Sequence, residues 1–224
     1  MDIGWYFNIG AVLSMLAAWL SGNWNALILG AVVVACSLVE MKLSWWEGSR
    51  HSEYEMSMNY TMLFLLMNVL SFLVVWILHQ DSIVLALWYF LCLSILFVLA
   101  FYDLDVRLLP DSFILLLAGA ALLWHISPYA PVTILDGLLG AAVLALVSGV
   151  VWLINRDAIG LGDIKLLAAL GFYAGLSVAV HIVVRGVFAA FFVALLLLLF
   201  KKAGRKTELP FVPFLLIGAI SLVF

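Results

Sequence analysis

Charged residues are scarce in this chain: only 10% of its 224 residues are Asp, Glu, Lys or Arg, while 67% are hydrophobic. Soluble domains have about a quarter charged and about half apolar residues. So much apolar surface cannot be packed inside one soluble core, and no polar stretch exceeds about twenty residues. The composition therefore predicts an all-α polytopic membrane helix bundle without a large soluble domain, with the lipid bilayer as its surroundings.

Cysteine is also scarce, and its placement excludes a class of site. Cys36 and Cys92 both lie inside apolar runs and neither belongs to a CxxC pair, which excludes a cysteine zinc site and argues against a structural disulfide. The four histidines are dispersed without metal-ligand spacing. No basic stripe supports nucleic-acid binding. We therefore expect no metal, no cofactor and no nucleic-acid partner.

Apolar runs separated by turn-forming residues predict about nine transmembrane helices, since a span needs roughly 20 residues. If the first run is interfacial, the number is eight. Asp2 rather than a basic region precedes this run, and no small-residue cleavage site follows it cleanly, so we expect no cleaved signal peptide. The predicted runs are 5–20, 24–41, 60–79, 83–102, 112–126, 132–154, 164–181, 183–200 and 210–224.

The basic residues predict an orientation, because cytoplasmic loops of membrane proteins carry the excess of Lys and Arg. If loop 42–59 is cytoplasmic, alternation of the runs places nine of the ten basic residues on that side and only Arg185 opposite. Asp103 and Asp163 then lie together at the cytoplasmic face. The nine are Lys42, Arg50, Arg107, Arg156, Lys165, Lys201, Lys202, Arg205 and Lys206.

These two aspartates are the strongest candidates for chemistry, because a carboxylate at the edge of hydrocarbon is costly unless it is used. Asp103 is predicted to close one helix; Pro110 follows, and Asp111 with Ser112 can cap the next helix. Asp163 is predicted in the first turn of another helix, where the positive dipole end favours a carboxylate.

Each aspartate also has a structural interpretation: Asp163 as a helix cap, Asp103 as a charge reaching from a helix end to water. We favour function for both, because they share a face and because Gly160 and Gly162 suit a close backbone approach or a positive φ rather than a cap. Two close aspartates share a proton, so the ionised one can activate water while the protonated one donates to a scissile carbonyl.

At these residues the sequence resembles the type IV prepilin peptidases, the GxGD membrane aspartyl proteases of bacteria and archaea. Three motifs match in order over about residues 60–224. They are Tyr102-Asp103 running into Leu109-Pro110-Asp111, then Gly160-Leu161-Gly162-Asp163 with the following Ile164-Lys165-Leu166-Leu167-Ala168, and Pro210-Phe211-Val212-Pro213-Phe214 opening the last helix.

The resemblance implies an endopeptidase that cuts the basic leader from prepilins or pseudopilins at the cytoplasmic membrane face, in type IV pilus or type II secretion systems. It implies Asp103 and Asp163 as catalytic residues, with Gly160, Gly162, Asp111, Pro110 and Lys165 supporting them. It also implies a peptidase domain at 60–224 after an N-terminal part at 1–59. Loop 42–59 departs from many bacterial members because it has no cysteine motifs, which argues against their second activity, N-methylation.

Two other classes remain open. Presenilin and signal-peptide-peptidase proteases also use YD and GxGD motifs, but they carry a proline-alanine-leucine element in the final helix, which Pro213-Phe214-Leu215 fits poorly. Their aspartates also lie on consecutive helices. A non-enzymatic transporter would place its coupling carboxylates near the middle of the membrane rather than at helix ends.

Overall fold

The computed structural model describes residues 42, 83–105, 107–128, 130–200 and 209–223. The chain divides into two compact units, Met1–Ser94 and Ile95–Phe224. The described part of the first unit is Lys42 and residues 83–94; the second unit contains nearly everything described below. The domain boundary predicted between residues 59 and 60 falls outside the described residues and stays a prediction.

All regular structure in the described ranges is helical, as the composition predicted. The helices are α4 (Ile83–Asp105), α5 (Asp111–Ile126), α6 (Ile134–Ile154), α7 (Leu161–Leu199) and α8 (Val212–Val223). Three helices among the described residues are long and apolar enough to cross a membrane, over Leu85–Asp105, Ile134–Ile154 and Leu161–Leu199. The predicted runs 5–20, 24–41 and 60–79 lie outside the described residues, so the number of nine helices stays a prediction.

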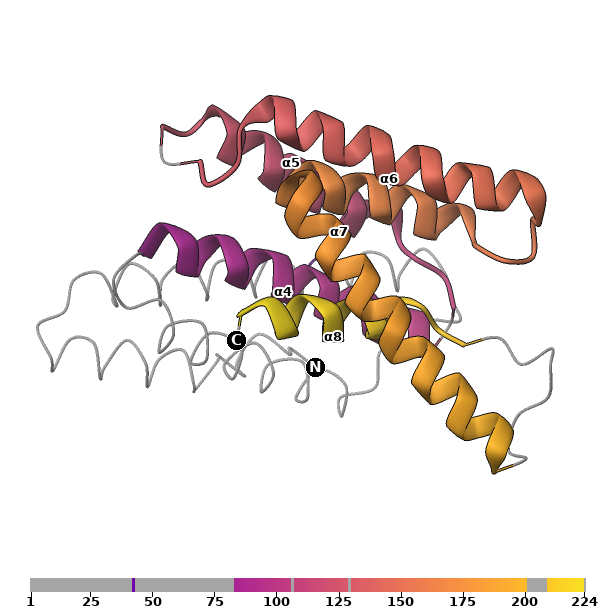
Figure 1. The fold of residues 1–224 in the computed structure, drawn as a ribbon. Helices are drawn as coiled ribbons and strands as arrows, with labels where there is room; N and C mark the ends of the chain where they lie inside the picture. The colour runs from indigo at the N-terminus through magenta and orange to yellow at the C-terminus, as the bar shows by residue number, and fades with distance from the viewer. Residues whose placement is uncertain (1–41, 43–82, 106, 129, 201–208, 224) are drawn as a thin grey trace, which may run out of the picture. The chain divides into compact units, whose positions relative to one another are not determined.

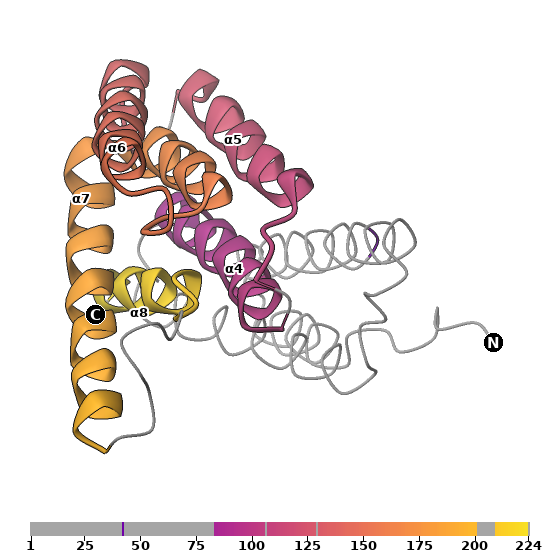
Figure 2. The same cartoon turned by 90° about the vertical axis from the view of Figure 1, so that its right-hand side faces the viewer.

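Helix α7 is the centre of the second unit and packs against α5, α6 and α8 (Figures 1 and 2). Glycines bring α6 and α7 into backbone contact. A Cβ atom on Gly140 would meet the carbonyl oxygen of Gly171, and one on Gly171 would meet the carbonyl of Gly140. Small residues allow this approach between membrane helices, where dispersion contacts rather than the hydrophobic effect drive association.

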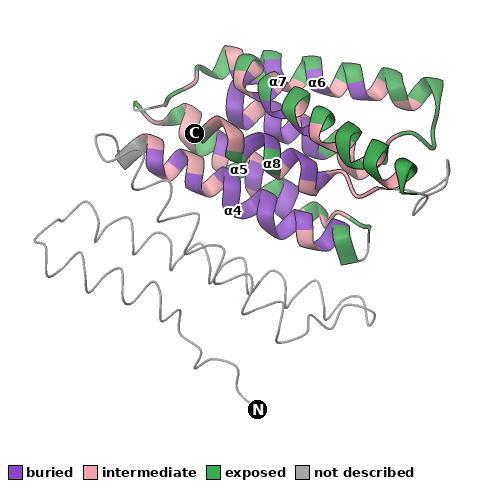
Figure 3. Cartoon of the chain, turned by 60° about the horizontal axis from the view of Figure 1, so that its bottom comes forward, coloured by how far each residue is buried: buried purple, intermediate pink, exposed green. Residues whose placement is uncertain are grey.

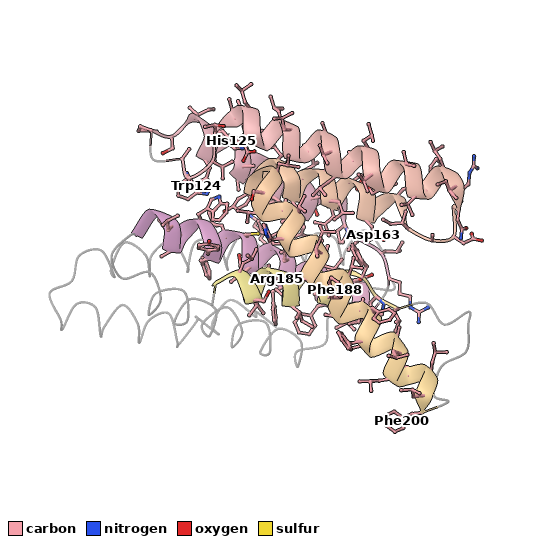
Figure 4. The ribbon with its side chains drawn as sticks, in the orientation of Figure 1. Trp124, His125, Asp163, Arg185, Phe188 and Phe200 are labelled. Atoms are coloured by element: carbon pink, nitrogen blue, oxygen red, sulfur yellow. The ribbon has the colours of Figure 1, made fainter. Side chains whose placement is uncertain are left out.

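Helix α7 consists of two helical segments that meet at Gly175, which has φ 76° and ψ 168°. The sequence predicted this break near Ile182, and that position is wrong. Only glycine adopts such a φ readily, and a Cβ atom here would also meet the Asp136 carboxylate and lie 2.7 Å from the Val132 side chain. The chain turns back at this point, so that Asp163 and Phe200 both lie away from His125 (Figure 4).

Exposure differs strongly between the parts of the second unit (Figure 3). The second segment of α7 presents exposed apolar side chains such as Phe188 and Phe192, and α6 presents Leu146 and Leu153. In contrast, Val212 and Leu215 of α8 are fully buried. Exposed apolar faces of this kind suit a helix that contacts lipid. Helix α8 has one buried face and also presents Ile217 and Ile220 on its exposed side.

Candidate active site

Four helix termini meet at one end of the second unit: the C-terminus of α4 and the N-termini of α5, α7 and α8. A hydrogen bond joins Asp103 of α4 to Val212 of α8, and an ion pair joins Asp111 of α5 to Lys165 of α7. All three predicted motifs therefore contribute residues to one region. In Figure 4 the labelled Asp163 lies toward this end, and Trp124 and His125 lie at the opposite end of the helices.

Asp103 is buried, with 7% of its surface exposed, in the last turn of α4. The helix continues to Asp105, so the prediction that Asp103 itself closes the helix is off by two residues. The backbone N–H of Arg107 donates to the carbonyl of Tyr102 at 3.1 Å, a bond between residues five apart that is typical of a helix C-terminus. Arg107 has φ 56°, a left-handed conformation uncommon outside glycine.

The Asp103 carboxylate is held by the N-terminus of α8. Its Oδ2 accepts a hydrogen bond from the backbone N–H of Val212 at 2.8 Å. Pro213, the next residue, has no N–H, so the first turn of α8 carries one unsatisfied donor fewer than usual. Asp103 thus caps a helix distant in sequence.

Asp163 lies in the first turn of α7, as predicted. Its Oδ2 accepts a hydrogen bond from the backbone N–H of Gly160 at 3.2 Å. Gly160 is the N-cap residue with φ −77°, so the prediction that the glycines have no cap function is wrong for this position. The side chain therefore does cap its helix. This is compatible with a second role as a reactive carboxylate, because the hydrogen bond found among the described residues involves Oδ2 and not Oδ1.

Gly162 supports the site by allowing a close approach. A Cβ atom at this position would lie 3.2 Å from Cβ and 3.4 Å from Cδ1 of Leu109. Gly175 is the glycine with a positive φ among the described residues, so close approach, rather than a left-handed backbone, explains Gly162. Leu109 belongs to the segment between α4 and α5, and this contact packs that segment against the start of α7.

Asp103 and Asp163 lie at the same end of the second unit, where Leu109, in the segment after α4, packs against Gly162 at the start of α7. They come from different helices, and each rests on a helix N-terminus: Asp103 on that of α8, Asp163 on that of α7. The partial positive charge at these termini favours carboxylates. Two such groups, one buried and one half-buried, can divide the tasks of base and acid between them.

The predicted cap at the start of α5 is wrong. Pro110 is the N-cap residue, and α5 has no side-chain cap hydrogen bond. Instead both carboxylate oxygens of Asp111 accept hydrogen bonds from Nζ of Lys165, each at 2.9 Å. This exposed ion pair links the start of α5 to the first turns of α7, two residues beyond Asp163.

The sequence motif from Pro210 to Phe214 was identified, but the sequence did not predict that a backbone N–H group at the start of α8 belongs to the site. The available signal was Pro213 within Pro210-Phe211-Val212-Pro213-Phe214: a proline in a helix's first turn tells where the helix begins and which N–H groups are free. No group of three or more His, Cys, Asp or Glu side chains in the described residues is arranged to hold a metal ion. The expectation that no metal takes part stays a prediction.

Comparison with known proteins now relates this geometry to a family. Residues 90–200 match the model of the type IV leader peptidase family. The chain is 30% identical over 206 residues to a prepilin leader peptidase/N-methyltransferase of Xanthomonas campestris pv. campestris, covering 82% of this chain and 69% of the relative.

Two further relatives carry the same description. The one from Pectobacterium carotovorum is 30% identical over 200 residues, covering 85% of this chain and 69% of the relative. The one from Klebsiella pneumoniae is 42% identical over 90 residues, covering 37% and 38%. No solved structure matches this chain.

Proposed function

Because this chain belongs to the type IV leader peptidase family, we propose that it is an aspartic endopeptidase with Asp103 and Asp163 as its catalytic pair. Its substrates are type IV prepilins or pseudopilins, from which it removes the basic leader. The observation that supports this proposal most directly is the position of the two aspartates on separate helices at one end of the second unit, where the segment after α4 packs against the start of α7. Peptide hydrolysis by two carboxyl groups requires that arrangement.

In the proposed reaction, the ionised aspartate takes a proton from water as the oxygen attacks the scissile carbonyl carbon. The protonated aspartate donates its proton to the carbonyl oxygen, giving a neutral tetrahedral intermediate. When this intermediate collapses, the C–N bond breaks and a proton passes to the leaving amine. Water supplies all the atoms that are added, so the two carboxyl groups need no other reactant.

The proposed orientation places this site at the cytoplasmic membrane face. Arg107, Arg156 and Lys165 all lie near the helix ends where Asp103 and Asp163 are located, since they flank the end of α4, the end of α6 and the start of α7. Such an excess of basic residues is typical of a cytoplasmic side. The proposed topology keeps about nine helices, with residues 60–224 forming the peptidase domain in the inner membrane.

Co-expression of the full chain with a prepilin tests the proposal. We expect leader removal by the unaltered protein and a loss of roughly 10⁴-fold or more for Asp103→Asn and for Asp163→Asn, because removing one member of a catalytic unit disables the whole. Membrane insertion is checked by the amount of protein in the membrane fraction.

Asp105→Asn is the matched control, because Asp105 is an exposed carboxylate on the same turn of α4. We expect it to cleave normally. Substantial cleavage by Asp103→Asn together with loss in Asp105→Asn would move the catalytic role to Asp105. Absence of leader removal by the unaltered chain with several prepilins would contradict the proposed function itself.

A further inference from the structure

Arg185 is a charged side chain within the apolar helix α7, and the reaction described above does not use it. It lies 14 residues before Leu199, roughly 21 Å along the helix axis. A charge inside a membrane segment is costly and usually has a defined partner. Figure 4 labels Arg185 on the second segment of α7, which packs against α8.

The partner of Arg185 is the C-terminal turn of α8. Its Nη1 donates to the carbonyl oxygen of Ser221, and the same atom lies 3.1 Å from the Ser221 hydroxyl oxygen. That hydroxyl donates in turn to the carbonyl of Gly218 at 2.7 Å. The last carbonyls of a helix lack intrahelical donors and carry the negative end of its dipole, so a guanidinium here stabilises the end of α8.

Between its termini, α8 lies directly on the backbone of α7. A Cβ atom on Gly186 would be 2.8 Å from the carbonyl oxygen of Phe214, and a Cβ atom on Gly218 would meet the carbonyl of Ile182. Gly186 is the neighbour of Arg185 in the sequence. The close contact and the arginine hydrogen bonds therefore hold α8 at one position along α7.

The opposite end of α8 holds the Asp103 carboxylate through Val212. The helix has 12 residues and is about 18 Å long, so a single short helix connects the Asp103 carboxylate with the Arg185 guanidinium. A negative charge lies at its positive end and a positive charge at its negative end. Any sliding or tilting of α8 would move the N–H group that orients Asp103.

We propose that Arg185 is a positioning residue for the peptidase reaction, acting through α8 on the Asp103 carboxylate. This inference rests on the proposed function, in which Asp103 takes part in catalysis. Arg185 itself touches neither carboxylate. Arg185 holds the C-terminal turn of α8, and through the helix it fixes the N-terminus of α8, which orients Asp103.

Steady-state cleavage of a prepilin by purified full-length protein tests the proposal. We expect Arg185→Gln to lower kcat about 10- to 100-fold, since displacements near 1 Å at a catalytic group have effects of that size, while KM changes little. Arg185→Lys retains a positive charge and should recover most of the lost rate. A merely structural role would lower the amount of folded protein without this separation of kcat from KM.

His181→Ala is the matched control, because His181 lies one turn before Arg185 and, among the described residues, its ring hydrogen-bonds to the Ser177 carbonyl of its own helix. We expect unchanged kcat. Infrared difference spectra between the unaltered protein and Asp103→Asn give a second measurement that needs no substrate. The carboxylate band of Asp103 should shift in Arg185→Gln. Unchanged kcat and an unshifted band would overturn the proposal, whereas a shifted band in a protein that cleaves nothing would count against the proposed function alone.

Discussion

The carboxylate of Asp103 accepts a hydrogen bond from the backbone N–H of Val212 at 2.8 Å, although 109 residues separate the two. This bond ties the end of α4 to the start of α8. Asp163 has a local counterpart in the Gly160 N–H. Both candidate catalytic groups are thus oriented by backbone donors rather than by flexible side chains, an arrangement that limits reorganisation during a reaction.

A larger side chain at Gly162 is expected to displace the start of α7. Gly162→Val places methyl groups against Leu109, where even a Cβ atom comes within 3.2 Å. Overpacking of this kind costs about 1–3 kcal/mol, and here it would also move Asp163. We expect leader cleavage to fall about tenfold or more, because small misplacements of catalytic groups are expensive. The measurement is the rate of prepilin cleavage by purified protein.

The second variant Leu109→Ala should restore part of the rate in the Gly162→Val background. It removes Cγ and Cδ1, which lie 3.6 and 3.4 Å from the Cβ position at Gly162, and leaves Cβ of residue 109 in place. Gly149→Val on α6 serves as the control, since nothing lies within 4 Å of a Cβ atom at Gly149. Equal losses of activity from Gly149→Val and Gly162→Val would count against a specific contact with Leu109.

His125 is expected to stabilise the break in α7. The break at Gly175 leaves carbonyl groups at the end of the first segment without helical partners. Nε2 of His125 lies 2.8 Å from the carbonyl oxygen of Phe172, and Nδ1 lies 3.2 Å from that of Val132. Loss of a donor to a buried carbonyl costs about 1–3 kcal/mol, and these carbonyls are partly buried, so His125→Ala should lower the thermal unfolding temperature in detergent.

The comparison for this prediction is Ser127→Ala, a change at a half-buried position just beyond the same helix end. It should have a smaller effect on the unfolding temperature than His125→Ala. The two substitutions lie far from the carboxylates, so leader cleavage at low temperature should persist in both. An unfolding temperature of His125→Ala equal to that of the unaltered protein would show that the two ring contacts contribute nothing to stability.

The ion pair between Lys165 and Asp111 is expected to contribute little to overall stability, because both side chains are more than half exposed. Exposed pairs are worth about 1 kcal/mol or less and weaken as salt is added. A double-mutant cycle with Asp111→Asn and Lys165→Met should give a coupling energy of that size at low salt, measured from unfolding in detergent. A coupling well above this value, or one independent of salt, would show that the pair is buried when the protein is in the membrane.

N-methylation of the product is expected to be absent. Loop 42–59 has Glu47, Glu53 and Glu55 but none of the cysteine motifs of many bacterial members of the family it resembles. Mass spectrometry of a mature pilin N-terminus, after processing by this protein alone with S-adenosylmethionine supplied, measures the outcome. An unmodified amine is the expected result. A product heavier by one methyl group would show that the chain retains the second activity named for its relatives.

The sequence by itself determined the class of this protein and the identity of its candidate site. Hydropathy depends only on composition along the chain, so it located α4, α5, α6 and α8 closely. The GxGD motif placed Asp163 in the first turn of a helix, because a glycine followed by a helix-forming run is a local signal. Three motifs in order also predicted the leader peptidase family, which the comparisons confirmed.

The tertiary structure alone decided where the polar groups find their partners. The break in α7 lies at Gly175 rather than near Ile182. Asp136 and Val132, from outside α7, occupy the space that a side chain at this position would need, so the residue there has to be glycine. Asp111 pairs with Lys165 instead of capping its own helix, and Asp103 caps α8 across the chain. Such bonds depend on which helix ends meet in space. The order of residues along the chain does not show which ends these are.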